Sequence, residues 1–385
     1  STCERTKLFG PVILLIWITK VSLRSSSVKR NLLLNPTTRQ VMSNALTSFN
    51  PGSGCGCKMA PNDLHRMLEQ SGDCGDFPGL LIGHETGDDA AVMDIGNGQL
   101  LIHTTDFFTP IVDDAFDFGR IAAANAISDV YAMGGTPSMA LAILGWPVDL
   151  LPVEQAAQVI AGARSVCKQA GIPLAGGHSI NIPQPLFGLS VTGHVHRDQL
   201  KRHAGAKPGD LLILTKPLGV GLLATAMKKG IATDRDIQWA IETMSQLNDI
   251  GSALAAIDGL HAMTDVTGFG LLGHAIELCE ASDVSATLSN KDLPTYNMKR
   301  LMELYGQHCL PQGTTKNFTA YVGDVSSMDG PQLAILCDPQ TSGGLLLSVA
   351  PEALDQVQGM LKQANLCDGV IGHVHETSSP RITIN

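Results

Sequence analysis

The chain has 385 residues, of which 44% are hydrophobic and only 4% aromatic, and its formal net charge is −10. This length and hydrophobic content suit two domains with buried cores, and residues 42–385 carry 19 Lys or Arg against 35 Asp or Glu. So acidic a body disfavours nucleic-acid binding, and it would accept a polyanion such as a nucleotide only with metal ions that neutralise both partners.

The first 41 residues differ from the rest, since they hold seven Lys or Arg and one acid. Their apolar run, at 12–18, is shorter than the roughly 20 residues of a membrane span, and its flanks fit a signal peptide poorly. We therefore expect no membrane partner. The favoured interpretation is that translation starts at Met42 and that residues 1–41 are an untranslated extension; a transit peptide is the alternative. Nine scattered cysteines favour reduced thiols in the cytoplasm over a disulfide scaffold.

A flexible leader is expected at 42–79, and its most reactive part is the stretch GSGCGCK at 52–58. Glycine leaves the backbone free to close over a substrate and reopen. Lys58 beside the thiols favours a reactive thiolate, which is a nucleophile or a ligand. The C-x-C spacing of Cys55 and Cys57 argues against a thioredoxin-type motif, and two cysteines are half a zinc site. The alternative is a disordered leader with incidental cysteines.

Apolar periodicity and turn residues predict an N-terminal domain at 80–200, after a leader helix at 61–70. The polar and turn-rich segment 197–210 is the expected junction. In chain order, the domain's predicted elements are strands at 90–93 and 100–102, a helix at 117–133, a strand at 139–144, a helix at 153–170, a short strand before the Gly-Gly pair at 176–177, and a strand at 187–195.

The second half, 201–385, mixes strands and helices in irregular order, so the chain is expected to be α+β in two domains. Its predicted elements are a strand at 211–214, a helix after 219–221, a helix at 236–256, a glycine-bordered loop at 263–274 leading into a helix to 281, a loop at 337–344, a strand at 345–349, a helix at 351–364 and a strand near 370.

Several acids lie where such folds present ligand groups, at strand ends, on a helix face or in glycine-bordered loops. Asn125 and Asp129 are four residues apart and share a helix face. Hard oxygen ligands without a Cys/His quartet indicate Mg²⁺ that bridges to substrate phosphates, although each residue alone is equally explained as a turn or capping aspartate. The candidate acids are Asp88, Asp89, Asp106, Asp129 and Asp265.

Seven stretches, in order along residues 52–385, resemble the selenophosphate synthetase (selenide, water dikinase) family. They are GCGCK at 54–58, DDAAV at 88–92, TTDFF at 104–108, NAISDVYAMGG at 125–135, AGGHS at 175–179, MTDVTGFG at 263–270 and CDPQTSGG at 337–344.

The resemblance implies an aminoimidazole ribonucleotide synthetase-like fold, with an N-terminal α/β domain that dimerises through its strands and a C-terminal α+β domain. It implies that ATP, hydrogen selenide and water give selenophosphate, AMP and orthophosphate, with Mg²⁺ required and K⁺ commonly needed as well. A homodimer is expected. Whether selenide arrives free or from a selenium-delivery protein is left open.

By position, the resemblance assigns Cys55 and Lys58 as catalytic. It assigns metal binding to Asp89, Asp129 and Asp265. Nucleotide contacts are implied for Lys58, Thr86, Gly87, Asp88, Asp106, Asp129, Gly176, Gly177 and His178.

Two other interpretations stay open at this point. Another ATP-using enzyme of the superfamily, such as a purine-pathway synthetase or a thiamine-phosphate kinase, would share the aspartates but not the Gly-Cys-Gly-Cys-Lys loop. A non-catalytic selenium carrier or metal-binding module would use Cys55 and Cys57, but it would leave the five aspartates without a role.

Overall fold

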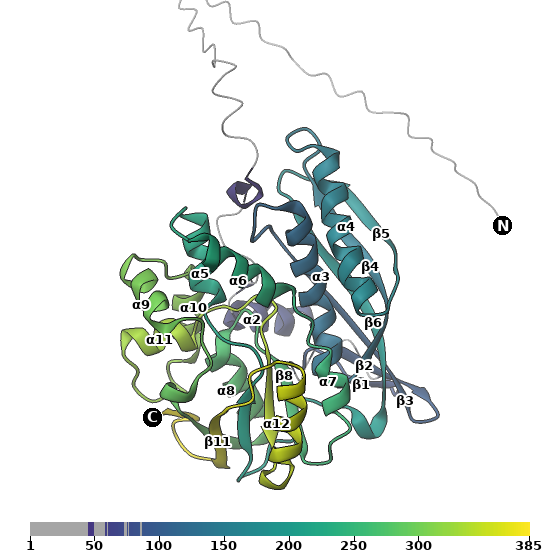
Figure 1. Cartoon of the computed structure of the whole chain (residues 1–385). Coiled ribbons are helices and arrows are strands. Elements are labelled where there is room, and N and C mark those ends of the chain that lie inside the picture. Colours follow the sequence, from purple (N-terminus) through teal and green to yellow (C-terminus); the bar gives the residue numbers. More distant parts are fainter. Residues whose placement is uncertain (1–44, 50–57, 60, 73–74, 76, 85–86) are drawn as a thin grey trace, which may run out of the picture. The chain divides into compact units, whose positions relative to one another are not determined.

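A computed structural model describes residues 45–49, 58, 59, 61–72, 75, 77–84 and 87–385 (Figure 1). The extension 1–41 and most of the Gly/Cys loop lie outside these residues. The α-helices are α2 (Pro61–Ser71), α3 (Ala115–Ala132), α4 (Val153–Gln169), α5 (Val220–Lys228), α6 (Asp234–Ser245), α7 (Ile250–Leu254), α8 (Gly270–Ser282), α9 (Met298–Gly306), α10 (Gln312–Tyr321), α11 (Gly330–Leu336) and α12 (Leu354–Gln363). Short 3₁₀ helices cover Leu46–Phe49, Arg197–Gln199, Asn290–Asp292 and Pro351–Ala353.

The strands form two six-stranded sheets. The first has the order β1-β2-β3-β6-β4-β5 and the second the order β12-β9-β11-β7-β10-β8. The strands are β1 (Leu80–Ile82), β2 (Ala91–Gly96), β3 (Gln99–Phe108), β4 (Thr136–Trp146), β5 (Leu174–Asn181), β6 (Leu186–His196), β7 (Leu211–Leu214), β8 (Leu260–Asp265), β9 (Val284–Leu288), β10 (Leu345–Val349), β11 (Val370–Glu376) and β12 (Ile382–Ile384).

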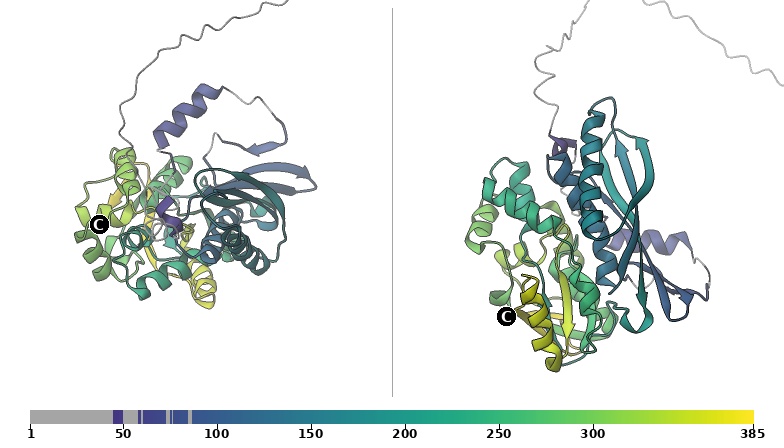
Figure 2. Two further views of the ribbon diagram at one scale, coloured as in Figure 1. Left: turned by 90° about the horizontal axis from the view of Figure 1, so that it is seen from above. Right: turned by 45° about the vertical axis from the view of Figure 1, so that its right-hand side comes forward.

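Helices α3 and α4 cover one face of the first sheet (Figures 1 and 2). Their small residues let the two backbones touch: a Cβ on Gly119 would lie 1.9 Å from the Val159 carbonyl oxygen, and one on Gly162 would lie 2.0 Å from that of Phe116. Asp114 caps α3 by accepting a hydrogen bond from the Asp117 amide. The alanine-rich α3 is therefore buried along most of its length, against both the sheet and α4.

The opposite face of the first sheet carries large exposed apolar side chains, because strand residues alternate between the two faces. They are Met93, Ile95, Phe107, Met139, Leu141 and Ile180. Large exposed apolar side chains that gather on one sheet face are typical of a protein interface.

The second sheet is buried on both faces, and every residue of β10 is buried. One face packs against α7 and α12, through Leu254, Val357 and Leu361. Leu212 and Leu346 belong instead to the larger core, which also contains α5 and α8 residues. Mainly antiparallel strands with helices on both faces fit the expected α+β class for this half.

Most predicted elements agree with the structure to within a few residues, but two differ. The single helix expected at 236–256 is wrong: α6 ends at Ser245 and α7 begins at Ile250, because Gln246 leaves the helical conformation. Gly176 and Gly177 lie inside β5 and not after it. Among the described residues, no helix has the length and apolar character needed to cross a bilayer.

Candidate functional site

Four aspartates that are far apart in the sequence converge where the two sheets meet through α3. Asp89 precedes β2, Asp106 lies on β3, Asp129 on α3, and Asp265 ends β8. Burial raises the pKa of Asp129 well above its ordinary value, and the negative charges of Asp265, Asp106 and Asp89 raise it further. Charges that raise the pKa of a carboxyl group act over short distances, so these four acids lie close together.

The shared face of Asn125 and Asp129 is confirmed, because both side chains reach β3. The Asn125 amide donates a hydrogen bond to Asp106, and the Thr104 hydroxyl donates one of 2.5 Å to Asp129. Thr104 and Asp106 are two residues apart and so lie on the same face of β3. Two residues that are four apart on α3 therefore contact two residues that are two apart on β3.

Asp265 is held from α3 as well. The Ser128 hydroxyl donates a 2.5 Å hydrogen bond to its Oδ2. Burial and the neighbouring Asp89 raise the pKa of Asp265 to about 6, although Ser128, His274 and Lys58 act in the opposite direction. A ligand that brings positive charge would relieve this repulsion.

Asp89 connects the two halves of the described chain. Its Oδ1 accepts a 2.9 Å hydrogen bond from Thr264 of β8 and lies 3.2 Å from Nε2 of His203. Burial lowers the pKa of His203, but nearby acids raise it to about 9, and the Asp89 carboxylate contributes most to this rise. The second oxygen, Oδ2, is buried without a hydrogen-bond partner among the described residues. An unpaired buried carboxylate oxygen is a ready ligand for a cation.

The donor set suits Mg²⁺ in one particular way. Within the described part of the chain, no three His, Cys, Asp or Glu side chains are arranged to hold a metal ion by themselves. Mg²⁺ is usually bound through one or two carboxylates, with the remaining positions taken by water and substrate phosphates. The aspartates therefore fit Mg²⁺ that arrives with a polyphosphate, and they do not fit a closed protein-only site.

Asp88 is held by the residues at the start of the second half of the chain, Arg202 and His203. Its Oδ1 accepts a 2.9 Å bond from the His203 amide, and its Oδ2 lies 3.3 Å from the Arg202 guanidinium. These residues and Gly87 line a cavity of about 400 Å³ that extends to Glu277 and Glu280. Thr86, beside it in sequence, lies outside the described residues.

Cys55 does not belong to the described residues. Lys58, on the same predicted loop, is described and lies near the acids. Its Nζ is 6.0 Å from the centre of the Phe269 ring, and its positive charge lowers the pKa values of Asp265 and Glu277. The predicted catalytic lysine thus lies next to the aspartate cluster.

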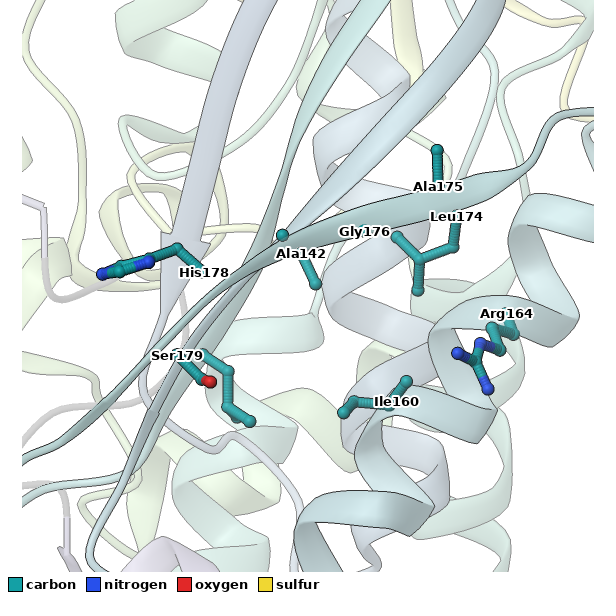
Figure 3. A pocket seen from close by; sticks show the side chains of 10 residues that line it. Ala142, Ile160, Arg164, Leu174, Ala175, Gly176, His178 and Ser179 are labelled. Carbon is teal, nitrogen blue, oxygen red and sulfur yellow. The ribbon is translucent and has the colours of Figure 1, made fainter.

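Gly176, Gly177 and His178 do not meet the aspartates within the chain. Asp106, Leu189, Ala142 and Gly177 form one row across β3, β6, β4 and β5. Three strand spacings place Gly177 about 14 Å from Asp106. The three predicted residues instead line a pocket of about 280 Å³ between β5 and α4, with Ile160 and Arg164 on the helix side (Figure 3).

Sequence reasoning missed several residues that shape the site. His203 and Arg202 lie in the segment assigned to a domain junction, and Ser128 and Asn248 carried no motif of their own. Only the three-dimensional contacts identify them, although Ser128 lies beside Asp129 within a recognised stretch.

Family models match most of the chain. The N-terminal domain of AIR synthase related proteins matches residues 87–195, and the C-terminal domain of the same family matches residues 207–385. Among solved structures, AaThiL complexed with AMPPCP and TMP has a TM-score of 0.63 at 20% identity, over 84% of this chain and 93% of that one. Thiamine-monophosphate kinase from Stenotrophomonas maltophilia K279a has a TM-score of 0.60 at 22% identity, over 86% and 96%. These similarities establish the fold.

Curated relatives are much more similar in sequence. The selenide, water dikinase of Photorhabdus laumondii is 52% identical over 343 residues, which are 88% of this chain and 97% of the relative. That of Yersinia pseudotuberculosis is 53% identical over 339 residues, with the same coverage. The chain therefore belongs to the AIR synthase related protein family and, within it, to the selenide, water dikinases.

Proposed function

We propose that the aspartate cluster binds ATP with Mg²⁺ and that the chain uses this ATP to make selenophosphate from selenide and water, with release of AMP and orthophosphate. The observation that carries the site assignment is the convergence of Asp89, Asp106, Asp129 and Asp265, because the charges of the other three acids raise the pKa of Asp129. Mg²⁺ that is bound together with a triphosphate would place positive charge among these oxygens and would relieve their mutual repulsion.

Asp89, Asp129 and Asp265 would hold Mg²⁺, while Asp88, Asp106, Thr86 and Gly87 would contact the nucleotide. When bound, Mg²⁺ neutralises the phosphate charge and orients the γ-phosphoryl group for in-line attack. The chain's own residues supply the positions. Thr104 and Ser128 fix the carboxylate oxygens of Asp129 and Asp265, so these acids need little reorganisation when the substrate binds.

Lys58 and Cys55 are proposed to act on the transferred group and on selenide. Lys58, already next to Asp265 and Phe269, would stabilise negative charge on the γ-phosphoryl oxygens. Cys55, on the same loop, would sequester or guide selenide to the γ-phosphorus. Selenide is a strong nucleophile and would attack the γ-phosphorus directly. The bond between the γ-phosphorus and the β–γ bridging oxygen breaks as the Se–P bond forms, and ADP leaves. Water then cleaves ADP to AMP and orthophosphate in the same site.

The chain is further proposed to be a homodimer that associates through the open face of the first sheet, which is the face opposite α3 and α4. The exposed apolar side chains on that face support this assembly. Gly176 to His178 lie at the β5 edge, about 14 Å from Asp106, so in a dimer they would be available to the nucleotide of a second copy. A K⁺ requirement, a selenium-delivery partner and a cytoplasmic location remain predictions from the sequence.

The roles of the loop and the aspartates are separated by two variants. Cys55→Ser is expected to abolish selenide-dependent ATP cleavage and to leave nucleotide binding intact, because Cys55 is assigned to selenide. Asp89→Ala is expected to weaken Mg-ATP binding at least about tenfold, because it removes a proposed metal ligand. Calorimetric titration with a nonhydrolysable ATP analogue, alongside the cleavage assay, measures both effects. Full turnover by Cys55→Ser would remove the loop from the mechanism.

A further inference from the structure

A buried lysine, which the mechanism above does not use, lies beneath the aspartate cluster. Lys216 follows β7 and is 1% exposed. Its ammonium group donates hydrogen bonds to the backbone carbonyls of Gln246, at 2.7 Å, and Ser342, at 3.0 Å. These two carbonyls belong to loops about 100 residues apart, so one side chain ties both loops together.

The loop at Ser342 is connected directly to the proposed nucleotide site. Ser342 adopts a left-handed backbone conformation with φ of 51°, which is uncommon for a residue other than glycine. In this conformation its amide donates a 2.8 Å hydrogen bond to Oδ1 of Asn125, whose amide nitrogen donates to Asp106. A chain of hydrogen bonds therefore runs from Lys216 through Ser342 and Asn125 to Asp106.

The loop at Gln246 reaches a second aspartate. Two residues on, the Asn248 amide donates 2.8 Å hydrogen bonds to Ser128 Oγ and to the Gly343 carbonyl. Ser128 in turn donates to Asp265. The break between α6 and α7 is thus the place where the chain turns to reach both α3 and the Ser342 loop.

The charge on Lys216 acts on the same cluster. Burial lowers the pKa of Lys216 to about 7, while the negative charges of Asp265 and Asp249 act in the opposite direction. A bound polyphosphate would add negative charge on the same side and would favour the protonated ammonium group further. In a poorly solvated site, the charge of the protonated ammonium group is screened less than one at the surface.

From these contacts we propose that Lys216 is a positioning residue for Mg-ATP: it holds the Ser342 and Gln246 loops so that Asp106 and Asp265 face the nucleotide, and it supplies a buried positive charge behind them. This inference rests on the proposed function of the aspartate cluster. It gives the C-terminal sheet a direct part in nucleotide binding, through the residue that follows β7.

The test compares two buried lysines in the full-length protein. Lys216→Met removes the charge and keeps most of the side-chain volume. Lys201→Met is the matched control, because Lys201 is 8% exposed and donates a 2.8 Å hydrogen bond to the Leu260 carbonyl, at the opposite end of β8 from Asp265. Calorimetric titration with a nonhydrolysable ATP analogue and Mg²⁺ gives the dissociation constant, and thermal unfolding reports whether each variant is folded.

We expect Lys216→Met to raise the dissociation constant at least about tenfold, whereas Lys201→Met stays within about threefold of the unsubstituted protein. A purely structural role for Lys216 would lower the unfolding temperature of Lys216→Met and leave its affinity equal to that of Lys201→Met. If Lys216→Met does not fold, Lys216→Gln, which retains N–H donors for the carbonyls, gives the same measurement without the charge.

The inference is overturned if a folded Lys216 variant binds the analogue within twofold of the unsubstituted protein, or if both lysine variants weaken binding equally. A third protein, Asp129→Asn, separates this failure from that of the proposed function. If Asp129→Asn loses affinity while Lys216→Met does not, only the role of Lys216 is wrong. If Asp129→Asn binds normally, the site assignment is wrong and the inference is overturned together with it.

Discussion

At the scale of single residues, the Asp129 carboxyl shows the conflict between stability and function in this chain. Burial and three neighbouring carboxylates raise its pKa above the value of an unfolded aspartate. An acid with a raised pKa in the folded state destabilises the fold once the pH exceeds its unfolded-state pKa of about 3.9. The loss of unfolding free energy grows until the pH passes the pKa in the folded state. The cluster of acids is therefore a source of instability, which the proposed binding of Mg-ATP would reduce.

Asp129→Asn should accordingly stabilise the metal-free protein at neutral pH while it weakens Mg-ATP binding. The amide oxygen of asparagine can still accept the Thr104 hydrogen bond, so the main change is the loss of charge. We expect the unfolding temperature in EDTA at pH 7 to rise by about 1 °C or more, which corresponds to about 1 kcal/mol in a chain of this size. The difference should shrink as the pH falls toward 4. An unfolding temperature below that of the unsubstituted protein at pH 7 would contradict this account.

The sequence predicted some of these residues and not others, for a physical reason. Asn125 and Asp129 were predictable because a helix places residues four apart on one face. The partners of Asp89 were not, since His203 and Thr264 reach it across more than 110 residues and no local pattern encodes such a contact. Asp88 was grouped with the other acids, whereas in the structure it pairs with Arg202.

At the scale of elements, the packing of α3 on α4 sets the position of Asn125 and Asp129. Gly162→Ala should therefore be strongly destabilising, because the added Cβ would lie 2.0 Å from the Phe116 carbonyl oxygen and would force the helices apart. Overpacking of this kind typically costs about 1–3 kcal/mol. Urea unfolding measures the loss.

Gly359→Ala, on α12, is the matched control for this substitution. Nothing lies within 4 Å of a Cβ built there, so the helix propensity of alanine should stabilise the protein by up to about 1 kcal/mol. Equal unfolding free energies for the two variants would mean that the close contact between α3 and α4 does not support the site.

Element prediction succeeded where the local signal was strong. Apolar spacing and glycine stops predicted α3 and α4, and short apolar runs on either side of a glycine-rich turn predicted β2 and β3. It failed at 246–249, where the sequence remains compatible with a helix but Asn248 is drawn into hydrogen bonds with Ser128 and Gly343. Tertiary contacts outweighed helix propensity there, and no local sequence pattern predicts such contacts.

At the scale of the whole molecule, the open face of the first sheet should mediate dimerisation. Met139, on the inner strand β4, is 40% exposed. Met139→Asp would place a charge in the apolar interface and should shift the protein from dimer to monomer in sedimentation velocity. Val148→Asp, at a loop position that is 49% exposed, is the control and should leave the dimer intact. A monomeric unsubstituted protein, or a dimeric Met139→Asp variant, would argue against this interface.

The fold of the whole molecule was expected only through family resemblance. Composition and element order gave two α+β domains, but they could not give the strand order of either sheet. The distance between Gly177 and Asp106 likewise depends on β6 and β4 lying between them, which the order of elements along the chain does not reveal. Long-range pairing decides these features.

The converging aspartates are proposed to bind Mg-ATP for transfer of its γ-phosphoryl group to selenide. Phosphorus-31 NMR of the protein with ATP, Mg²⁺ and selenide tests it most directly, with Asp129→Asn in parallel. We expect selenophosphate, orthophosphate and AMP to appear together with the unsubstituted protein, and their rate of formation to fall at least about a hundredfold with Asp129→Asn. Formation of ADP without selenophosphate, or an undiminished rate with Asp129→Asn, would contradict it.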